Sequence, residues 1–393
     1  MKARIRTFFD NILFTPKPLP AGTYQGTHQL PDGKSCRLHL RIDPSGDGIL
    51  LVNASTILHL NTSATEFAFH LIKCTSENVI VEEFNKRYKA TANQVVEDFN
   101  IFTGRLESLI LTPDLDPESF LDIERIELHQ DHISAPIRLD CALTYQIPEG
   151  SSTVFTPVDR VKRLLDTSEW KLILQKAWDK GIPHIIFTGG EPTLRPDLFE
   201  LIAHSEQLGQ VTGLITDGLR ICEKGYLHSL LQSGLDHIML VLDPSMPESW
   251  EAVKDIVNED ISLTVHLTLN RAFLATSNKT IEMLKSNGVT KISLSADSPE
   301  TGAFLPEFTR TVQEAGMTLV WDLPVPYSEL NPIAQELLNS GNNLKGAARS
   351  WLYIEPDGDV LPGQGINTVL GNALTDSWET IWSSAKIWIN ETK

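Results

Sequence analysis

The chain has little cysteine, and its cysteines are not arranged to hold a metal. Cys36, Cys74, Cys141 and Cys222 lie far apart among 393 residues. Zinc and iron–sulfur sites usually contain at least one closely spaced pair of cysteines. A disulfide framework is not expected in a cytosolic chain of this size. All four cysteines are therefore interpreted as buried or incidental thiols.

The chain is also short of basic charge and of long apolar runs. Thirty-three lysines and arginines stand against 51 acidic residues, a net charge of −18, with no basic stripe that would indicate nucleic-acid binding. The acidity indicates a solvated surface and also suits a basic peptide partner. No apolar run reaches the roughly 18 residues of a membrane span. The apolar segment 5–14 contains charged residues and no cleavage site follows it, so a cytoplasmic location is expected.

The first third of the chain predicts a small α+β domain over residues 23–115, between an N-terminal arm (1–22) and a polar linker (116–135). Apolar residues alternate in three stretches, the period of an antiparallel sheet. These stretches are 37–42, 48–53 and 55–60. Three short helical patterns follow, and together the elements predict a winged-helix-like fold.

Two of these helices begin with residue pairs typical of a capping box, in which side chain and backbone at the first turn bond each other. The pairs are Ser63 with Glu66 and Thr91 with Gln94.

Residues 136–325 alternate apolar strands with helical patterns, which predicts an α/β fold with a parallel sheet. The predicted strands are 137–143, 184–189, 211–216, 237–242, 262–269, 291–295 and 317–323. Such a series suits a partial TIM barrel of the (β/α)6 type, which works at the C-terminal ends of its strands. Residues 326–393 form a short extension, with a hairpin that turns at 356–358 and a final helix.

The string FTGGEPTLRPD, residues 187–197, follows an apolar strand and precedes a helix. Paired glycines at the end of a strand let the backbone approach a ligand closely. The carboxylate of Glu191 can accept hydrogen bonds from an ammonium group, and Pro192 fixes the turn. A glycine pair alone indicates a turn without a ligand, whereas the whole string indicates homology.

This string resembles the motif by which radical S-adenosylmethionine (SAM) enzymes hold the amino group of SAM at the second barrel strand. Residues 137–382 resemble a radical SAM barrel followed by a SPASM-type extension. Residues 23–110 resemble the PqqD-like peptide-recognition domain through LHLRID, NASTILHLNTSATEF and EEFNKRY. The resemblance covers nearly all of the chain and implies a place in ribosomal-peptide modification.

The resemblance also implies cysteines that this chain lacks. The family's CxxxCxxC follows the first strand, where QIPEGSSTVF stands here, with Ile147, Ser151 and Val154 at the cysteine positions. Isoleucine and valine have no lone pair to offer iron, and serine is a poor substitute for a thiolate. In the SPASM-like segment Gly363 stands where a cysteine is usual. We therefore expect both the 4Fe-4S cluster and the auxiliary cluster to be absent.

What the resemblance leaves is a partial SAM pocket. ITDGLR (215–220) resembles the family's TNG turn with aspartate for asparagine, and Val241 replaces a hydroxyl residue often found on the fourth strand. Without iron to chelate, SAM is expected to bind weakly. The predicted cofactor-binding residues are Thr188, Gly189, Gly190, Glu191, Pro192, Asp217, Asn270 and Ser293, with Ser295 as an alternative to Ser293. For Asn270 and the serines, capping of strand-end turns is the competing interpretation.

The first functional hypothesis is a non-catalytic peptide-binding or scaffold component of a peptide-modification system. Its partners would be a precursor or leader peptide and a cluster-containing radical SAM enzyme. The peptide would add as a strand beside 55–60, at Ile57, Leu58 and His59, next to the helix 93–108.

The second hypothesis is an enzyme with cluster-independent chemistry in the barrel mouth, such as SAM-dependent methyl transfer or hydrolysis. Glu191, Asp217 and Asp243 are the carboxylates available near strand ends for acid–base work. A decaying paralogue without function is a third possibility.

Other signals are weaker. His129 and His132 flank an acidic linker, where a metal role is disfavoured, and Trp321, Asp322 and Tyr327 are candidates for the lining of a pocket. No G-x-S-x-G elbow, Walker loop or HExxH motif is present.

Overall fold

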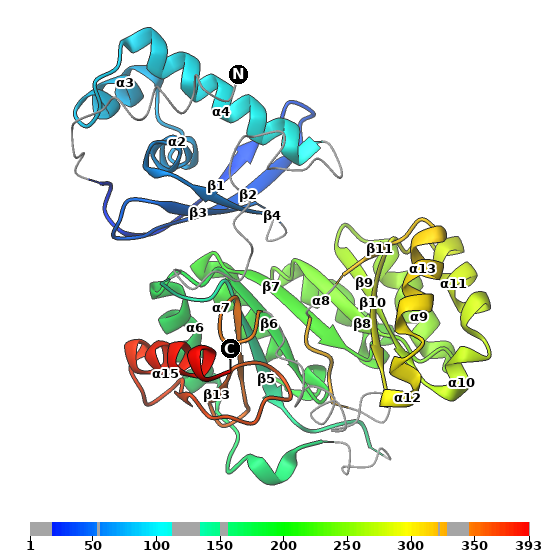
Figure 1. The fold of residues 1–393 in the computed structure, drawn as a ribbon. Helices are drawn as coiled ribbons and strands as arrows, with labels where there is room; N and C mark the ends of the chain where they lie inside the picture. The colour runs from blue at the N-terminus through cyan, green and yellow to red at the C-terminus, as the bar shows by residue number, and fades with distance from the viewer. Residues whose placement is uncertain are drawn as a thin grey trace. The chain divides into compact units, whose positions relative to one another are not determined.

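A computed structural model describes residues 18–52, 56–111, 134–149, 156–320, 323–327 and 346–392. The chain divides into two compact units, Met1–Glu127 and Leu128–Lys393. Each unit has a sheet of its own (Figure 1).

Unit 1 contains a four-stranded antiparallel sheet in the order β1-β2-β3-β4. The strands are β1 (Gly22–Gln29), β2 (Ser35–Ile42), β3 (Gly48–Val52) and β4 (Thr56–Leu60). The antiparallel sheet expected from the alternating pattern is confirmed. The additional strand β1 has the polar sequence GTYQGTHQ and none of its residues is fully buried, so hydrophobic alternation could not reveal it.

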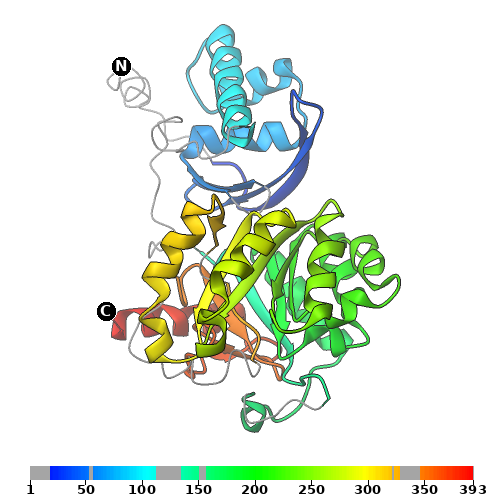
Figure 2. The ribbon, with the colours of Figure 1, turned by 90° about the vertical axis from the view of Figure 1, so that its right-hand side faces the viewer.

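Three helices lie on one face of this sheet, as Figures 1 and 2 show. They are α2 (Thr62–Ile72), α3 (Glu77–Asn85) and α4 (Ala92–Leu111). Leucines of the sheet, including Leu38, Leu40 and Leu50, form a core with Leu106 of α4. Burial of this apolar face is what holds the helices to the sheet.

One of the two predicted capping boxes is confirmed and the other is wrong. At α4 the Thr91 N–H donates to Gln94 Oε1 (3.1 Å), and the Gln94 N–H donates to Thr91 Oγ1 (3.4 Å). At α2 the cap is Asn61, whose side chain accepts from the Ala64 N–H. Glu66 is instead buried and paired with Arg87 at 2.6 Å, because a carboxylate this far from water needs a charged partner.

The described residues of unit 2 form a ten-stranded sheet in the order β11-β10-β9-β8-β7-β6-β5-β12-β13-β14. The strands are β5 (Arg138–Thr144), β6 (His184–Gly189), β7 (Val211–Thr216), β8 (His237–Val241), β9 (Ser262–Leu269), β10 (Lys291–Ala296), β11 (Thr318–Leu319), β12 (Trp351–Ile354), β13 (Asp359–Leu361) and β14 (Gly371–Asn372). Strands β5 to β11 are parallel and follow chain order, as in a partial barrel. The α/β class is thus confirmed.

Helices connect the parallel strands, and Figure 1 shows α9, α11 and α13 outside β8, β9 and β10. The connecting helices and turns are α6 (Thr167–Asp179), η3 (Pro192–Leu194), α7 (Leu198–Leu208), η4 (Leu219–Cys222), α8 (Tyr226–Gln232), α9 (Pro247–Val257), α10 (Arg271–Leu274), α11 (Ser277–Ser286), α12 (Pro299–Gly302) and α13 (Leu305–Glu314); η2 (Val158–Arg160) precedes α6 and α15 (Trp378–Glu391) ends the chain. The strand predicted over 317–323 is shorter, since β11 ends at Leu319.

The C-terminal segment extends the barrel sheet. β12 pairs in parallel with β5, and β13 returns antiparallel to β12. The turn between them has Gly358 at φ +91°, a left-handed conformation that favours glycine. The hairpin predicted at 356–358 is therefore confirmed. None of the helices in the described ranges is long and apolar enough to cross a membrane.

The barrel interior is apolar in its middle layer and polar at its N-terminal end. Ile186, Ile215 and Met239 pack together. At the N-terminal ends of β6 and β8, His184 Nε2 and His237 Nε2 lie 2.8 Å apart. The strand between them has Gly213, where a Cβ atom would approach His237 Cε1 to 2.1 Å. Glycine is therefore required at position 213 to leave room for the imidazole ring of His237.

We predict that Gly213→Ala destabilises unit 2 by about 1–3 kcal/mol, because the methyl group must displace a buried ring. Urea unfolding followed by circular dichroism measures the change. Gly302→Ala is the matched control, since its Cβ would lie 3.8 Å from Ala296 Cβ, an ordinary contact. Equal stability of the two variants would contradict the packing described for His237.

Candidate functional site

A cavity of about 300 Å³ lies at the C-terminal ends of β5 to β8. Its lining comes from the segments that follow these strands and from Pro326 and Tyr327. The lining residues are Ile147, Pro148, Glu149, Gly190, Glu191, Asp217, Leu219, Val241, Asp243, Met246, Ser249, Pro326 and Tyr327. This is the end of a barrel at which ligands usually bind.

The glycine pair joins the end of β6 to the end of β5. Gly189 has φ +135°, and a Cβ there would lie 2.1 Å from the carbonyl oxygen of Thr144. A Cβ on Gly190 would lie 2.2 Å from the carbonyl oxygen of Gln146. The N–H of Gly190 donates to Thr144 O (2.8 Å), and the N–H of Glu191 donates to Gln146 O (2.7 Å). The glycines therefore serve close backbone packing at the cavity wall.

The Glu191 carboxylate is buried and accepts four hydrogen bonds. Oε1 accepts from Thr193 N (3.0 Å), Thr193 Oγ1 (2.6 Å) and Thr216 Oγ1 (2.8 Å). Oε2 accepts from the N–H of Asp217 (2.8 Å). This side chain thus connects the turn after β6 to the end of β7, and much of its acceptor capacity is already used within the protein.

Glu191 and Asp217 influence each other's protonation. Burial, together with repulsion from Asp217, raises the pKa of Glu191 to about 8. Burial likewise raises the pKa of Asp217. Two carboxyl groups this close and this dry do not both ionise readily, so the pair holds a proton near neutral pH.

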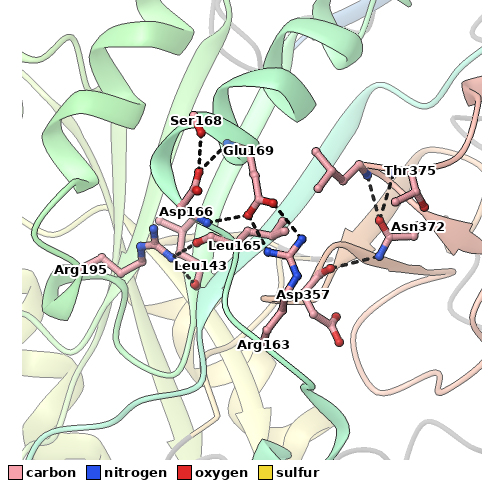
Figure 3. Close-up of polar contacts among 11 residues, drawn as sticks. Leu143, Arg163, Leu165, Asp166, Ser168, Glu169, Arg195, Asp357, Asn372 and Thr375 are labelled. Atoms are coloured by element: carbon pink, nitrogen blue, oxygen red, sulfur yellow. Dashed lines mark hydrogen bonds and ion pairs between the residues drawn. The ribbon is translucent and has the colours of Figure 1, made fainter.

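Arg195, in the same motif, fixes the loop that follows β5 (Figure 3). Its Nη1 donates to Leu143 O (3.1 Å) and to Leu165 O (2.9 Å). Its other nitrogens bind both oxygens of Asp197, at 2.8 and 2.7 Å. Asp166 caps α6 in a capping box with Glu169. The motif after β6 therefore positions both ends of the segment between β5 and α6.

Three of the predicted cofactor-binding residues, Gly190, Glu191 and Asp217, line the cavity. Asn270 and Ser293 are not among its lining residues. Asn270 caps α10, where its Oδ1 accepts from the Phe273 N–H at 2.7 Å. Ser293 lies within β10, with its hydroxyl 3.0 Å from His266 Nδ1. A contact of these residues with a nucleoside stays a prediction.

Only some of the remaining predicted positions lie in the part of the chain that the structure describes. Ile147 lines the cavity. Ser151, Val154, His129, His132, Trp321, Asp322 and the side chain of Ile57 lie outside the described residues. Leu58 packs into the core between sheet and helices of unit 1, whereas His59 is only half-buried.

Sequence reasoning missed Glu149, Met246 and Ser249, which line the cavity. Each follows a strand end, which is the signal that could have found them. With Glu191, Asp217 and Asp243, Glu149 brings the carboxyl groups of the lining to four. No lysine, arginine or histidine is among these lining residues, so the cavity favours a cationic ligand.

Thiols do not contribute to this lining. All four cysteines are free, and Cys141 is buried within β5, where burial raises the pKa of its thiol. Among the described residues, no three side chains of histidine, cysteine, aspartate or glutamate are grouped as a metal site.

Comparisons with known proteins agree with this architecture. Residues 141–261 match the radical SAM superfamily. The chain is 26% identical over 285 residues to the PqqA peptide cyclase of Streptomyces rochei, covering 65% of this chain and 77% of the cyclase. The cyclase of Rhizobium meliloti (strain 1021) is 26% identical over 287 residues, covering 64% of this chain and 74% of the cyclase.

The solved structures extend the likeness beyond the radical SAM domain. The structure of Streptococcus suis SuiB bound to precursor peptide SuiA has a TM-score of 0.59 and 16% identity, and covers 91% of this chain and 88% of that chain. SuiB bound to S-adenosylmethionine has a TM-score of 0.59 and 17% identity, and covers 88% of this chain and 86% of that chain. Both shares exceed what unit 2 alone makes up, so the shared fold reaches into unit 1.

We predict that Asp217→Asn flattens the pH dependence of stability. The unfolded chain ionises Glu191 near its ordinary pKa of 4.5, whereas the folded chain does so at about 8. Stability therefore falls as pH rises between these values and the loss is complete above the folded pKa. Asparagine removes the repulsion, lowers the folded pKa of Glu191 and makes the loss smaller.

Urea unfolding from about pH 5 to about pH 8 measures this slope. Asp243→Asn, in the same lining, is the control and should keep the original slope. An unchanged slope in Asp217→Asn would show that the two carboxyl groups are not coupled.

Proposed function

We propose that this chain is a non-catalytic, peptide-binding component of a ribosomal-peptide modification system, with a radical SAM fold that no longer carries iron. The likeness to SuiB, solved with a precursor peptide, and to PqqA peptide cyclases supports the substrate class. The observation that carries the proposal is the strand β4, which pairs with β3 on one side and ends the order of the sheet in unit 1.

The edge of β4 suits strand addition by an extended peptide. An edge strand presents backbone N–H and C=O groups that a peptide can pair with. Leu58 is in the core, so it would contribute through its backbone, whereas the half-buried His59 would also offer its ring. A net charge of −18 favours a basic peptide. A winged-helix-like, PqqD-like unit 1 is part of this proposal.

We predict that a peptide selected for binding to the full chain from a displayed library slows amide exchange in β4 but not in β1. Both are edges of the same sheet, so β1 serves as an internal control. Hydrogen exchange with and without the peptide, read by mass spectrometry, measures the change.

Paired variants sharpen this test. His59→Pro removes a backbone amide from β4 and should weaken binding, while Thr27→Pro removes one from β1 and should not. Protection confined to β1, or to neither edge, would contradict a binding site at β4.

The loss of iron is proposed from the residues at both cluster positions. Ile147, at the first cysteine position of the family motif, lines the cavity with a hydrocarbon side chain. In the SPASM-like extension, a Cβ on Gly363 would lie 3.3 Å from Trp351 Nε1 and 3.5 Å from Ala347 Cβ. A side chain at position 363 would thus press against Trp351 and Ala347, and no step of radical chemistry is assigned to this chain.

The cavity supports weak binding of SAM. Pocket volumes of about 300 Å³ are at the low end for small-molecule ligands. The carboxyl groups of Glu149, Asp217 and Asp243 would face the ammonium and sulfonium charges, and Val241 and Met246 would offer apolar contact. Glu191 has little acceptor capacity left. If bound, SAM would supply an electrophilic methyl group.

We predict that the chain, after anaerobic reconstitution with iron and sulfide and desalting, retains far less than one iron instead of the ~4 of a cubane. Iron and sulfide analysis measures this, and chromatography checks for 5′-deoxyadenosine from SAM. The triple variant Ile147→Cys, Ser151→Cys, Val154→Cys restores the thiolate spacing and should gain iron. A cubane on the unaltered chain would overturn the proposal.

The arrangement of Glu191 and Asp217 favours the second candidate function, SAM-dependent methyl transfer. The two carboxyl groups share one cavity with Asp243, and such a pair can accept a proton from a nucleophile. Formation of S-adenosylhomocysteine by the iron-free chain, in the presence of the selected peptide, distinguishes this enzyme from a binding protein.

A further inference from the structure

A row of hydroxyl and imidazole groups crosses β9 and β10, away from the cavity described above. The two strands are parallel neighbours, with His266 beside Ser293 and Thr268 beside Ser295. His266 Nδ1 lies 3.0 Å from Ser293 Oγ, and His266 Nε2 lies 2.9 Å from Ser295 Oγ. One imidazole therefore contacts a serine at each of its nitrogens.

The two serines take different roles toward this ring. A neutral imidazole donates from one nitrogen and accepts at the other. With the proton on Nδ1, His266 donates to Ser293 and presents the lone pair of Nε2 to the hydroxyl of Ser295. Thr268 Oγ1, at 3.4 Å, is the more distant neighbour of Ser295 Oγ. A nucleophile bonded to a base, with the base held by a third group, is the arrangement of hydrolytic triads.

Ser295 is more exposed than His266 and Ser293, which is the order that a nucleophile and its base require. His266 is completely buried and Ser293 is 5% exposed, whereas Ser295 is only partly buried. Ser295 is the residue before the last of β10, at the barrel end where ligands bind. The hydroxyl of Ser295 thus belongs to the least buried of the three residues, while the base stays dry.

We propose that Ser295 is a nucleophile, with His266 as its general base and Ser293 as the residue that positions the imidazole, acting on carboxylic esters. Ser295 Oγ bonds to the ester carbonyl carbon and its proton passes to His266 Nε2. The alcohol leaves with that proton as the C–O bond breaks. Water then cleaves the acyl-serine, which releases the acid. The proposal goes beyond peptide binding and does not depend on it, and the non-catalytic role proposed above refers to radical chemistry alone.

A fluorophosphonate probe tests this on the full chain. Serine attack forms an O–P bond and expels fluoride, so each labelled chain gains the mass of one probe. Intact mass spectrometry measures the rate, and peptide mapping locates the adduct. We expect one adduct, on Ser295, that is absent from Ser295→Ala and from heat-denatured protein. Ser286→Ala, which removes an exposed serine on α11, should label at the original rate.

Two further measurements test the role of the imidazole. His266→Gln should slow labelling by about 100-fold or more, the usual contribution of a general base. Ser293→Ala should slow it less, and should change the rate without moving the adduct. Because His266 is buried, its variant is checked by circular dichroism.

Three results would overturn the proposal. They are the absence of an adduct on the native chain, an adduct on a serine other than Ser295, and an unchanged labelling rate in a folded His266→Gln variant. Each leaves the peptide-binding proposal untouched, because that rests on β4 in unit 1.

Discussion

The buried carboxyl group of Glu191 is the interaction on which the top of the barrel depends. It receives hydrogen bonds from Thr193, Thr216 and Asp217, which belong to the turn after β6 and to the end of β7. Such a group is costly to bury unless all its partners are in place. The glycine pair brings the same turn against β5, so three consecutive strand ends are joined around one side chain. The cavity takes its shape from this joint.

Contacts within the protein also fix the segments where the family resemblance implies cluster cysteines. The loop after β5 is anchored by backbone bonds to Gly190 and Glu191 and by the guanidinium of Arg195. At the other end of the chain, Trp351 packs against Gly363. Contacts within the protein thus hold both segments, which supports the proposed loss of iron.

The sequence was sufficient to predict those elements that are buried on both faces or that have a clear hydrophobic period. β6 and β7 were predicted with their bounds, because each is a short apolar run between turn signals. The polar edge strand β1 gave no such signal. Ser63 and Glu66 fit a capping box, but Asn61 took the cap and Glu66 was drawn to Arg87, a partner 21 residues away. A tertiary ion pair therefore overrides a capping box that the local sequence predicts.

The candidate site shows the same limit. Glu191 and Asp217 could be found because a motif and a strand end mark them. The pairing of His266 with Ser293 and Ser295 could not, because it depends on the register of two strands that are separated by the 21 residues 270–290. Two chemically different sets of side chains therefore lie toward the C-terminal ends of the barrel strands. Carboxyl groups gather after β5 to β8, where they favour a cation, and hydroxyl and imidazole groups gather on β9 and β10, where proton transfer between neutral groups is possible. Both groups lie on the same parallel sheet.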